Sequence, residues 1–206
     1  MNRVQESFVL TGFTIAITSI FLITIGNNAF GVEYTNYTSE KYGIQFEYPL
    51  ELTVIEKTSR FQETPDIEVT SHNSIHIGII SKDTSQFGIS DIDDAVKRII
   101  PTQKMLFLDY DVRIIEEPHL TTIGNEMAAT AVIAAKERFE DVPLEFANQL
   151  WIVINDSQTY GISYLDTPSQ FDSQEHTLIR EHFINSIQFI GDSATQNSSN
   201  TSSRFD

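Results

Sequence analysis

The chain has 206 residues, with 13 basic and 29 acidic side chains that give a formal net charge of −16 at pH 7. A surface this acidic repels phosphate backbones and anionic headgroups, which argues against nucleic-acid binding and against docking on anionic membranes. The sequence contains no cysteine, so it excludes disulfides, thiol catalysis, thiolate metal sites and a lipid-modified cysteine anchor.

Residues 8–26 form an uncharged stretch rich in Phe, Ile, Leu and Thr, which is long enough to cross a bilayer and also fits the apolar core of a secretory signal. Ala29 and Gly31 supply small side chains for a cleavage site before Val32. Residues 1–31 are therefore predicted to be either a cleaved signal peptide or a retained membrane anchor. Either alternative places the rest of the chain outside the cytoplasm, secreted or anchored to the cell membrane, with membrane contact only through residues 8–26.

The exported part begins with an alternation that is typical of β-strands. Ile44, Phe46 and Tyr48 alternate with polar residues. Pro49 cannot donate a hydrogen bond to a sheet ladder, so the strand is predicted to stop there. The alternation resumes over residues 52–54, which predicts a hairpin between the two segments.

A second hairpin is predicted where residues 67–70 and 75–79 alternate on either side of a turn. A polar loop is expected over residues 82–88. A helix then follows, with Ser90 as its predicted cap and apolar residues at helical spacing. Pro101 is expected to end or kink this helix.

The second half of the exported part is predicted to consist mostly of strands. Residues 112–116 and 118–123 are the first two. Residues 127–135 contain alanines that favour a helix, but a preceding turn and several β-branched residues favour a strand. Residues 146–155 are predicted to be a central strand, paired with residues 160–164.

A final helix is predicted to begin near Asp172 or Ser173 and to lead into a short strand over residues 187–190. Residues 191–206 have almost no apolar content and are predicted to be a disordered tail. The order strands, helix, strands, helix predicts an α+β fold in which helices pack on an antiparallel sheet.

Two short segments resemble the PsbP-like family, whose members are related to an extrinsic subunit of photosystem II. The first is Y-T-S at residues 37–39 followed by Y-G-I-Q-F-E-Y-P at residues 42–49, and the second is S-I-Q-F-I at residues 186–190. One departure is Leu52, which stands where the family commonly has tryptophan. The resemblance implies an α/β/α sandwich over residues 34–190 in an exported, non-photosynthetic member. None of the family's functional positions has a matching motif here, so no site residue is carried over.

The motifs of familiar catalytic sites are incomplete in this sequence. Residues 161–165 begin like a nucleophile elbow but lack its second glycine and lie in a predicted strand. His176 and His182 are six residues apart, so they point in different directions around a helix and are predicted to be ordinary surface histidines. No glycine-rich phosphate loop is present, and no organic cofactor is expected.

Carboxylates offer the one candidate metal site. Asp91, Asp93 and Asp94 could bind a hard cation such as Ca²⁺ through oxygen ligands. The same residues are also explained as acids at the positive end of a helix dipole. Both interpretations stay open.

Four asparagines stand in acceptor sequons for N-glycosylation and are predicted to lie in loops or tails: Asn36, Asn155, Asn197 and Asn200. Such positions suit an exported protein, so surface glycosylation is a secondary hypothesis.

These features predict a non-catalytic, extracytoplasmic accessory or binding domain whose partner is another cell-surface or membrane protein. The first alternative is a domain that binds a divalent cation or a small ligand through the acidic clusters. The second is a hydrolase of unfamiliar layout, which would require a pocket that groups a nucleophile with a histidine or a perturbed carboxylate.

Overall fold

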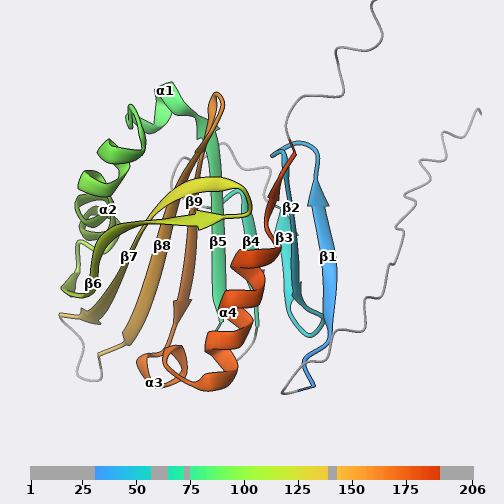
Figure 1. The fold of residues 1–206 in the computed structure, drawn as a ribbon. Helices are drawn as coiled ribbons and strands as arrows, with labels where there is room; N and C mark the ends of the chain where they lie inside the picture. The colour runs from blue at the N-terminus through green and yellow to red at the C-terminus, as the bar shows by residue number, and fades with distance from the viewer. Residues whose placement is uncertain (1–30, 57–64, 72–74, 139–142, 191–206) are drawn as a thin grey trace, which may run out of the picture.

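The computed structural model describes residues 31–56, 65–71, 75–138 and 143–190. Most of these residues form two antiparallel sheets (Figure 1). The larger sheet has seven strands in the order β3-β4-β5-β9-β8-β7-β6. Their bounds are Thr53–Glu56 for β3, Ile67–Thr70 for β4, His76–Asp83 for β5, Tyr110–Ile123 for β6, Glu126–Glu137 for β7, Glu145–Asn155 for β8 and Gln158–Asp166 for β9.

The smaller sheet has three strands in the order β1-β2-β10. Their bounds are Tyr34–Ser39 for β1, Ile44–Pro49 for β2 and Gln188–Phe189 for β10. The helices of the described residues are α1 at Thr84–Phe87, α2 at Ile92–Leu106, α3 at Pro168–Phe171 and α4 at Gln174–Ser186. The smaller sheet thus combines two strands from the start of the domain with one from its end.

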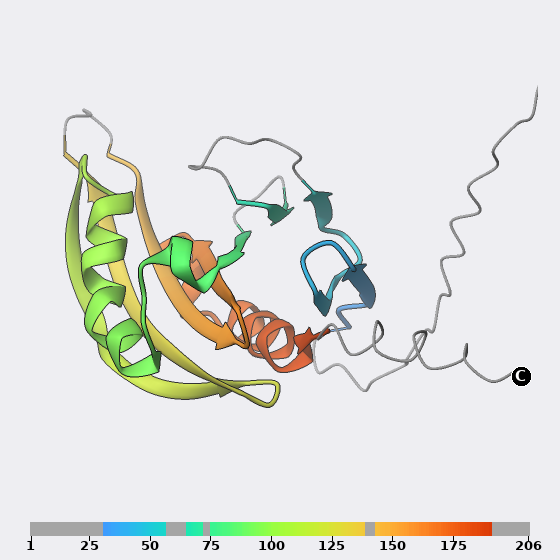
Figure 2. The ribbon, with the colours of Figure 1, turned by 90° about the horizontal axis from the view of Figure 1, so that it is seen from above.

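Helices and the smaller sheet cover the two faces of the larger sheet. Figure 2 shows α2 and α4 on opposite sides of β8 and β9. One apolar core lies between α2 and the larger sheet, and a second core joins the other face of that sheet to α4 and the smaller sheet. The predicted α+β fold, an antiparallel sheet with helices on both faces, is therefore confirmed.

The alanine-rich segment is strand β7, as predicted, and it pairs with β6 on one side and β8 on the other. Ala129, Ala131 and Ala135 belong to the core beneath α2. Thr130 and Val132 alternate with them and are also buried. Small side chains let the helix approach the sheet closely, and strand partners on both sides override the helical propensity of alanine.

The first predicted hairpin is wrong, and the second is confirmed. β2 pairs with β1 and β10, whereas β3 pairs with β4 in the larger sheet. Residues 50–52 therefore carry the chain from one sheet to the other, with Leu52 N–H donating to Pro49 O at 2.9 Å. Alternation predicts which face of a strand is buried but does not identify its partner. β4 and β5 form the second predicted hairpin, with Ile67 opposite Ile79.

The structure corrects the predicted ends of helix α2. Asp91 and not Ser90 is its N-cap, because the Asp91 side chain accepts a hydrogen bond from Asp94 N–H at 2.8 Å. Of the two outcomes predicted at Pro101, the end of the helix is wrong, because α2 continues to Leu106. Burial of its apolar face outweighs the loss of the one backbone hydrogen bond that proline cannot donate.

Two further segments differ from prediction, and one agrees. The expected loop at residues 82–88 contains the end of β5 and all of α1. The strands predicted at residues 112–116 and 118–123 form the single strand β6, with register shifts on both sides of Glu116. Ser173 is the N-cap of α4, as predicted, and the short strand β10 follows that helix.

Residues 1–30, which make up nearly all of the predicted export segment, and the predicted tail at residues 191–206 lie outside the described residues. Within the described part, no helix is long and apolar enough to cross a membrane. The choice between a signal peptide and an anchor therefore stays open.

Candidate functional site

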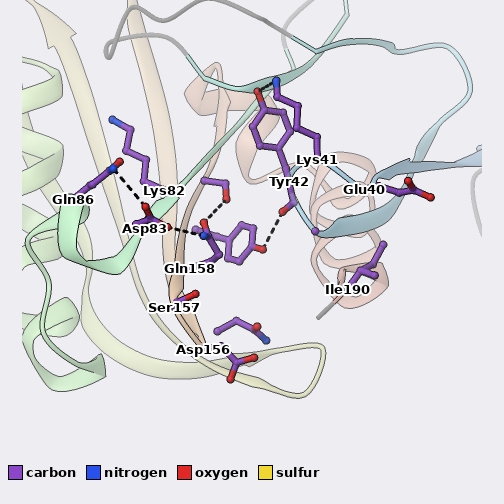
Figure 3. A pocket seen from close by; sticks show the side chains of 14 residues that line it. Glu40, Lys41, Tyr42, Lys82, Asp83, Gln86, Asp156, Ser157, Gln158 and Ile190 are labelled. Atoms are coloured by element: carbon purple, nitrogen blue, oxygen red, sulfur yellow. Dashed lines mark hydrogen bonds between the residues drawn. The ribbon is translucent and has the colours of Figure 1, made fainter. Parts of the chain in front are cut away.

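A polar cleft lies where three turns of the fold come together (Figure 3). The first is the β1–β2 turn, the second is the connection from β5 to α1, and the third is the β8–β9 turn. The cleft has a volume of about 500 Å³. It is lined by Glu40, Lys41, Tyr42, Gly43, Ser81, Lys82, Asp83, Gln86, Asn155, Asp156, Ser157, Gln158, Tyr160 and Ile190.

The β1–β2 turn is held by two hydrogen bonds to its backbone, one from β9 and one from the residue after β10. Tyr160 donates its hydroxyl hydrogen to Tyr42 O at 2.9 Å, and Ile190 N–H donates to Gly43 O at 2.7 Å. Gly43 has a φ of +61°, and an added Cβ would meet Ile190 O at 3.0 Å and the Tyr160 hydroxyl at 3.2 Å. Glycine in the Tyr42-Gly43 pair, part of the segment that resembles the PsbP-like family, therefore has a local explanation. A side chain at Gly43 would strain the turn and would clash with Ile190 O and the Tyr160 hydroxyl.

The opposite wall of the cleft is held by a chain of side-chain hydrogen bonds, drawn in Figure 3. Gln158 Nε2 donates to Asp83 Oδ1 at 2.9 Å, and Gln86 Nε2 donates to Asp83 Oδ2 at 3.5 Å. Ser81 Oγ donates to Gln158 Oε1 at 3.4 Å. These bonds hold the β5 end, α1 and the β8–β9 turn in one arrangement.

Charged groups of both signs stand around the cleft. Lys41 Nζ donates to the Tyr42 hydroxyl at 2.5 Å and lies 3.6 Å from Glu56 Oε1. The hydrogen bond to Tyr42 raises the pKa of Lys41. Tyr37 donates its hydroxyl hydrogen to Glu56 Oε2 at 2.6 Å; burial, followed by that hydrogen bond, raises the pKa of Tyr37. Tyr37, Ser39 and Lys41 therefore all contact the Glu56 carboxylate, and Lys41 links it to the cleft.

The chemistry of the cleft is that of hydrogen bonding and charge. Amides, hydroxyls, carboxylates and ammonium groups line it, and there is no histidine among the described lining residues. Ser163, from the incomplete nucleophile elbow, lies elsewhere in β9, where its Oγ donates to Gly78 O at 3.4 Å. The arrangement suits reversible binding of a polar group.

A second cavity of about 380 Å³ lies along the ends of β6, β7 and β8 beside the α3–α4 connection. Two ion pairs stand at or near its rim: Lys136 Nζ lies 2.6 Å from Glu145 Oε1, and Arg138 Nε lies 2.8 Å from Asp111 Oδ1. Both pairs are exposed, and such pairs contribute little to stability. This cavity therefore has the character of a solvated surface.

A buried histidine–aspartate pair joins β9 to α4. His176 Nδ1 makes a short hydrogen bond with Asp166 Oδ2, and the Asp166 side chain is fully buried. Asp166 Oδ1 also accepts from Thr167 N–H at 2.7 Å. His176 was expected to be an ordinary surface histidine, but it pairs with a buried carboxylate and only 14% of its side chain is exposed. Nothing in the local sequence signals this contact, because it depends on how α4 packs against β9.

Arg180 supports the same corner of the domain. Its Nη1 donates to Phe171 O at 2.9 Å, and its guanidinium carbon lies 4.0 Å from the centre of the Phe171 ring. Burial lowers the pKa of Arg180 and raises that of Tyr164. These contacts hold α3 and α4 against β9, so we assign the cluster a structural role.

His182 makes a comparable but more exposed link. Its Nε2 lies 2.7 Å from Glu47 Oε2, and its ring stacks on Tyr34 with the centroids 3.8 Å apart. Burial raises the pKa of Tyr34, with further contributions from the nearby charges of Glu51 and Glu47. The pair joins α4 to the smaller sheet.

The predicted calcium ligands have other partners in the structure. Asp91 caps α2, and Asp94 Oδ1 accepts from Arg98 Nε at 2.8 Å. That hydrogen bond, followed by one from Ser90 N–H, lowers the pKa of Asp94. Asp93 is exposed in the first helical turn. The described residues include no group of three or more acidic or histidine side chains placed to hold a metal ion, and calcium binding stays a prediction.

Two of the four sequons do not lie in loops, as they were predicted to. Asn36 is an exposed residue within β1, and Asn155 ends β8 and donates from Nδ2 to Glu126 Oε1 at 3.0 Å. A sequon is a short local pattern, and it does not indicate whether the chain around it is extended. Asn197 and Asn200 lie outside the described residues.

The fold defines the chain as a small α+β sandwich with a polar cleft at one end. No protein-family model and no curated protein sequence matches it. The solution structure of cyanobacterial PsbP (CyanoP) from Synechocystis sp. PCC 6803 is similar, with a TM-score of 0.58 and 12% identity over 81% of this chain and 97% of that chain. The chain therefore has a PsbP-like fold, as residues 37–49 and 186–190 predicted.

Two other solved structures are similar at lower TM-scores. LpqN of Mycobacterium tuberculosis, described as involved in cell envelope biogenesis, has a TM-score of 0.48 and 8% identity over 78% of this chain and 92% of that chain. A protein of Bacteroides thetaiotaomicron has a TM-score of 0.44 and 13% identity over 76% of this chain and 48% of that chain.

Proposed function

We propose that the chain is an exported, non-catalytic accessory domain that binds another protein at the cell surface. One observation carries the proposal: a PsbP-like fold, matched over 97% of CyanoP, follows a segment with the features of an export signal or anchor. Fold alone does not define function, but the cleft also supports a binding role. Its side chains are bound to one another in a fixed polar wall, which favours recognition over covalent chemistry.

Location is the first test. The full chain is expressed in its native cells and the cytoplasmic, membrane and external fractions are separated. The expected product is either a chain that begins at Val32 or an intact chain in the membrane that external protease digests. A chain that stays protected in the cytoplasm contradicts the proposal.

Accessory function is the second test. The full chain is cross-linked in intact cells and isolated under denaturing conditions, and its adducts are identified by mass spectrometry. A single recurrent surface protein in near-equal amount is the expected result. Turnover of substrate by the purified chain, abolished by one substitution in the cleft, would instead support an enzyme.

A small polar ligand is the second candidate function. The volume of the cleft, about 500 Å³, lies in the range of small-molecule sites, about 300–1,000 Å³. Titration of the full chain with amino acids and sugars, followed by amide chemical shifts, tests this candidate. Changes at Asp83 and Gln158 that saturate, without changes at the second cavity, are the expected result.

A further inference from the structure

The outer side of strand β1 is an open edge of the smaller sheet. β1 pairs only with β2 among the described strands, and Figure 1 shows it at the outside of the fold. The β1–β2 register places Tyr34 opposite Pro49 and Ser39 opposite Ile44. An open edge presents unpaired backbone N–H and C=O groups that another extended chain can bind.

The hydrogen-bond pattern identifies the backbone groups that face outward. Leu50 N–H donates to Glu33 O at 2.8 Å, in register with the β1–β2 pairs. Bonded and non-bonded pairs alternate along an antiparallel ladder, so Thr35, Tyr37 and Ser39 direct their backbone groups to β2. The intervening residues direct theirs away from β2: Tyr34, Asn36 and Thr38.

The other long edge of the fold is protected, and β1 is not. β6 is 14 residues long, but Pro118 and two register shifts interrupt it, and charged side chains such as Arg113 stand along it. These are the features by which natural sheets prevent pairing at an edge. β1 has six residues, with no proline, no charge and no register shift, and its tyrosines and threonines favour strands.

We propose that the outer edge of β1 binds an extended, basic segment of another protein, which adds to the smaller sheet as a fourth strand. The proposal rests on the proposed accessory function and deepens it by naming the surface and the chemistry of the partner. Carboxylates flank the strand at both ends, with Glu33 before it and Glu40 after it, and Glu51 lies near Tyr34. Basic residues near the ends of the added strand match these charges.

A second copy of the chain is a poorer occupant of the edge. Each copy carries a formal charge of −16, so pairing two of them brings like charges together around a short strand. A basic partner is attracted by the same negative charges. If a second copy occupies the edge, protection of the outward backbone amides of β1 from hydrogen exchange rises with protein concentration, whereas a basic partner protects them only when it is added.

Backbone hydrogen exchange of the full chain, measured by NMR, tests the proposal residue by residue. The probe is a synthetic peptide of alternating threonine and valine with lysine at each end, and the control peptide has glutamate at each end. In the free chain, the amides of Tyr34, Asn36 and Thr38 exchange quickly, while those of Thr35 and Tyr37 are protected by β2. At ten times its Kd, the lysine peptide slows the three outward amides about tenfold. The glutamate peptide leaves them unchanged.

Two substitutions at Thr38 separate strand addition from other effects. Thr38→Pro removes an outward N–H that β2 does not use and places a ring in the edge, so it abolishes protection of Asn36 by the lysine peptide. Thr38→Val keeps the N–H and retains the protection. Both substitutions remove the sequon at Asn36, so glycosylation does not distinguish them.

A charge variant keeps the test informative if Thr38→Pro does not fold. Glu33→Gln combined with Glu40→Gln weakens binding of the lysine peptide about three- to tenfold, since it removes two exposed ion pairs.

Equal protection by the two peptides, or equal binding by the proline and valine variants, overturns the proposal. So does protection of the outward amides in the free chain that rises with protein concentration, which identifies a second copy. A cytoplasmic location contradicts the proposed function, whereas failure of the lysine peptide overturns only the β1 site.

Discussion

The two faces of the larger sheet are covered by cores of different kinds. Beneath α2 the core is built from alanines and branched aliphatic side chains, with a buried amide pair in which Asn148 Nδ2 donates to Gln103 Oε1 at 3.3 Å. On the other face, aromatic rings and two histidine–carboxylate pairs join the sheet to α4 and the smaller sheet. The first core depends on close approach of the helix to the sheet, and the second depends on large side chains and on hydrogen bonds between histidines and carboxylates.

The largest expected effect is on the aromatic core. Phe183 is fully buried, and its ring centre lies 5.1 Å from that of Phe46. Phe183→Ala leaves a cavity between α4 and β2 and is expected to lower the free energy of unfolding by about 3–5 kcal/mol. Urea denaturation of the full chain measures this loss. Leu178→Ala, at a residue of the same helix that is 38% exposed, is the matched control and should cost less than about 1 kcal/mol.

The buried pair is expected to contribute more than the exposed pair. The Asp166 carboxylate is hydrogen-bonded to both Thr167 N–H and His176 Nδ1. Asp166→Asn turns an amide N–H₂ group toward one of these two partners, and is expected to lower the free energy of unfolding by about 2–3 kcal/mol. Glu47→Gln makes the same change beside His182, where water can reach both groups, and should cost less than about 1 kcal/mol. Denaturant midpoints of the two variants compare them directly. Equal losses would contradict the assigned difference in burial.

The alanine core is expected to reject added volume. Ala131→Val inserts two methyl groups beneath α2 and is expected to cost about 1–2 kcal/mol by overpacking. Ala134→Val adds the same volume in the same strand, but Ala134 borders the second cavity and should change stability by less than about 0.5 kcal/mol. Thermal unfolding of both variants makes the comparison. A neutral Ala131→Val would show that α2 lies less closely on the sheet.

Alkaline pH is expected to lower the free energy of unfolding through Tyr164. Burial, followed by the charge of Asp166, raises the pKa of Tyr164, so the folded chain holds this proton more tightly than the unfolded chain does. The resulting stability is present below the ordinary tyrosine pKa of about 10 and is lost as pH rises through the higher folded value. Tyrosinate absorbance, followed together with unfolding, should show Tyr164 ionising only when the fold opens. Tyr164→Phe removes this part of the pH dependence.

The smallest effect is expected at the start of α2. The hydrogen bonds from Arg98 and from Ser90 N–H lower the pKa of Asp94, so its contribution is present above the ordinary value of about 3.9 and is lost as pH falls through the folded value. Arg98→Gln should raise the pKa of Asp94 toward that value, as measured by NMR titration. An unchanged pKa would show that the Ser90 N–H bond alone is responsible.

Local patterns predicted the strands better than they predicted strand partners. The pairings within residues 67–79 and within residues 146–164 are confirmed, because few residues separate the two strands of each pair and leave them little choice of partner. Residues 44–48 pair with β1 and with β10, which is more than 130 residues away, and no alternation can indicate such a distance. The resemblance supplied the fold that periodicity alone left open.

The cleft could not be predicted from the sequence, because it is formed by three turns that only the folded sheet brings together. Gly43 is its one local signal, since a glycine before an alternating strand indicates a turn with an unusual backbone. The burial of Asp166 and its contact with His176 could not be predicted for a related reason. Polar residues near the end of a strand are usually solvated, and only the position of α3 and α4 encloses these two.

The position of β10 sets the order in which the domain can be completed. Its residues form the third strand of a sheet whose first two strands open the domain, and Ile190 N–H then closes on the β1–β2 turn. A polypeptide that emerges N-terminus first cannot finish this sheet until residues 188–190 are free. All seven strands of the larger sheet precede β10 in the chain, so the smaller sheet is the part of the domain that is completed last.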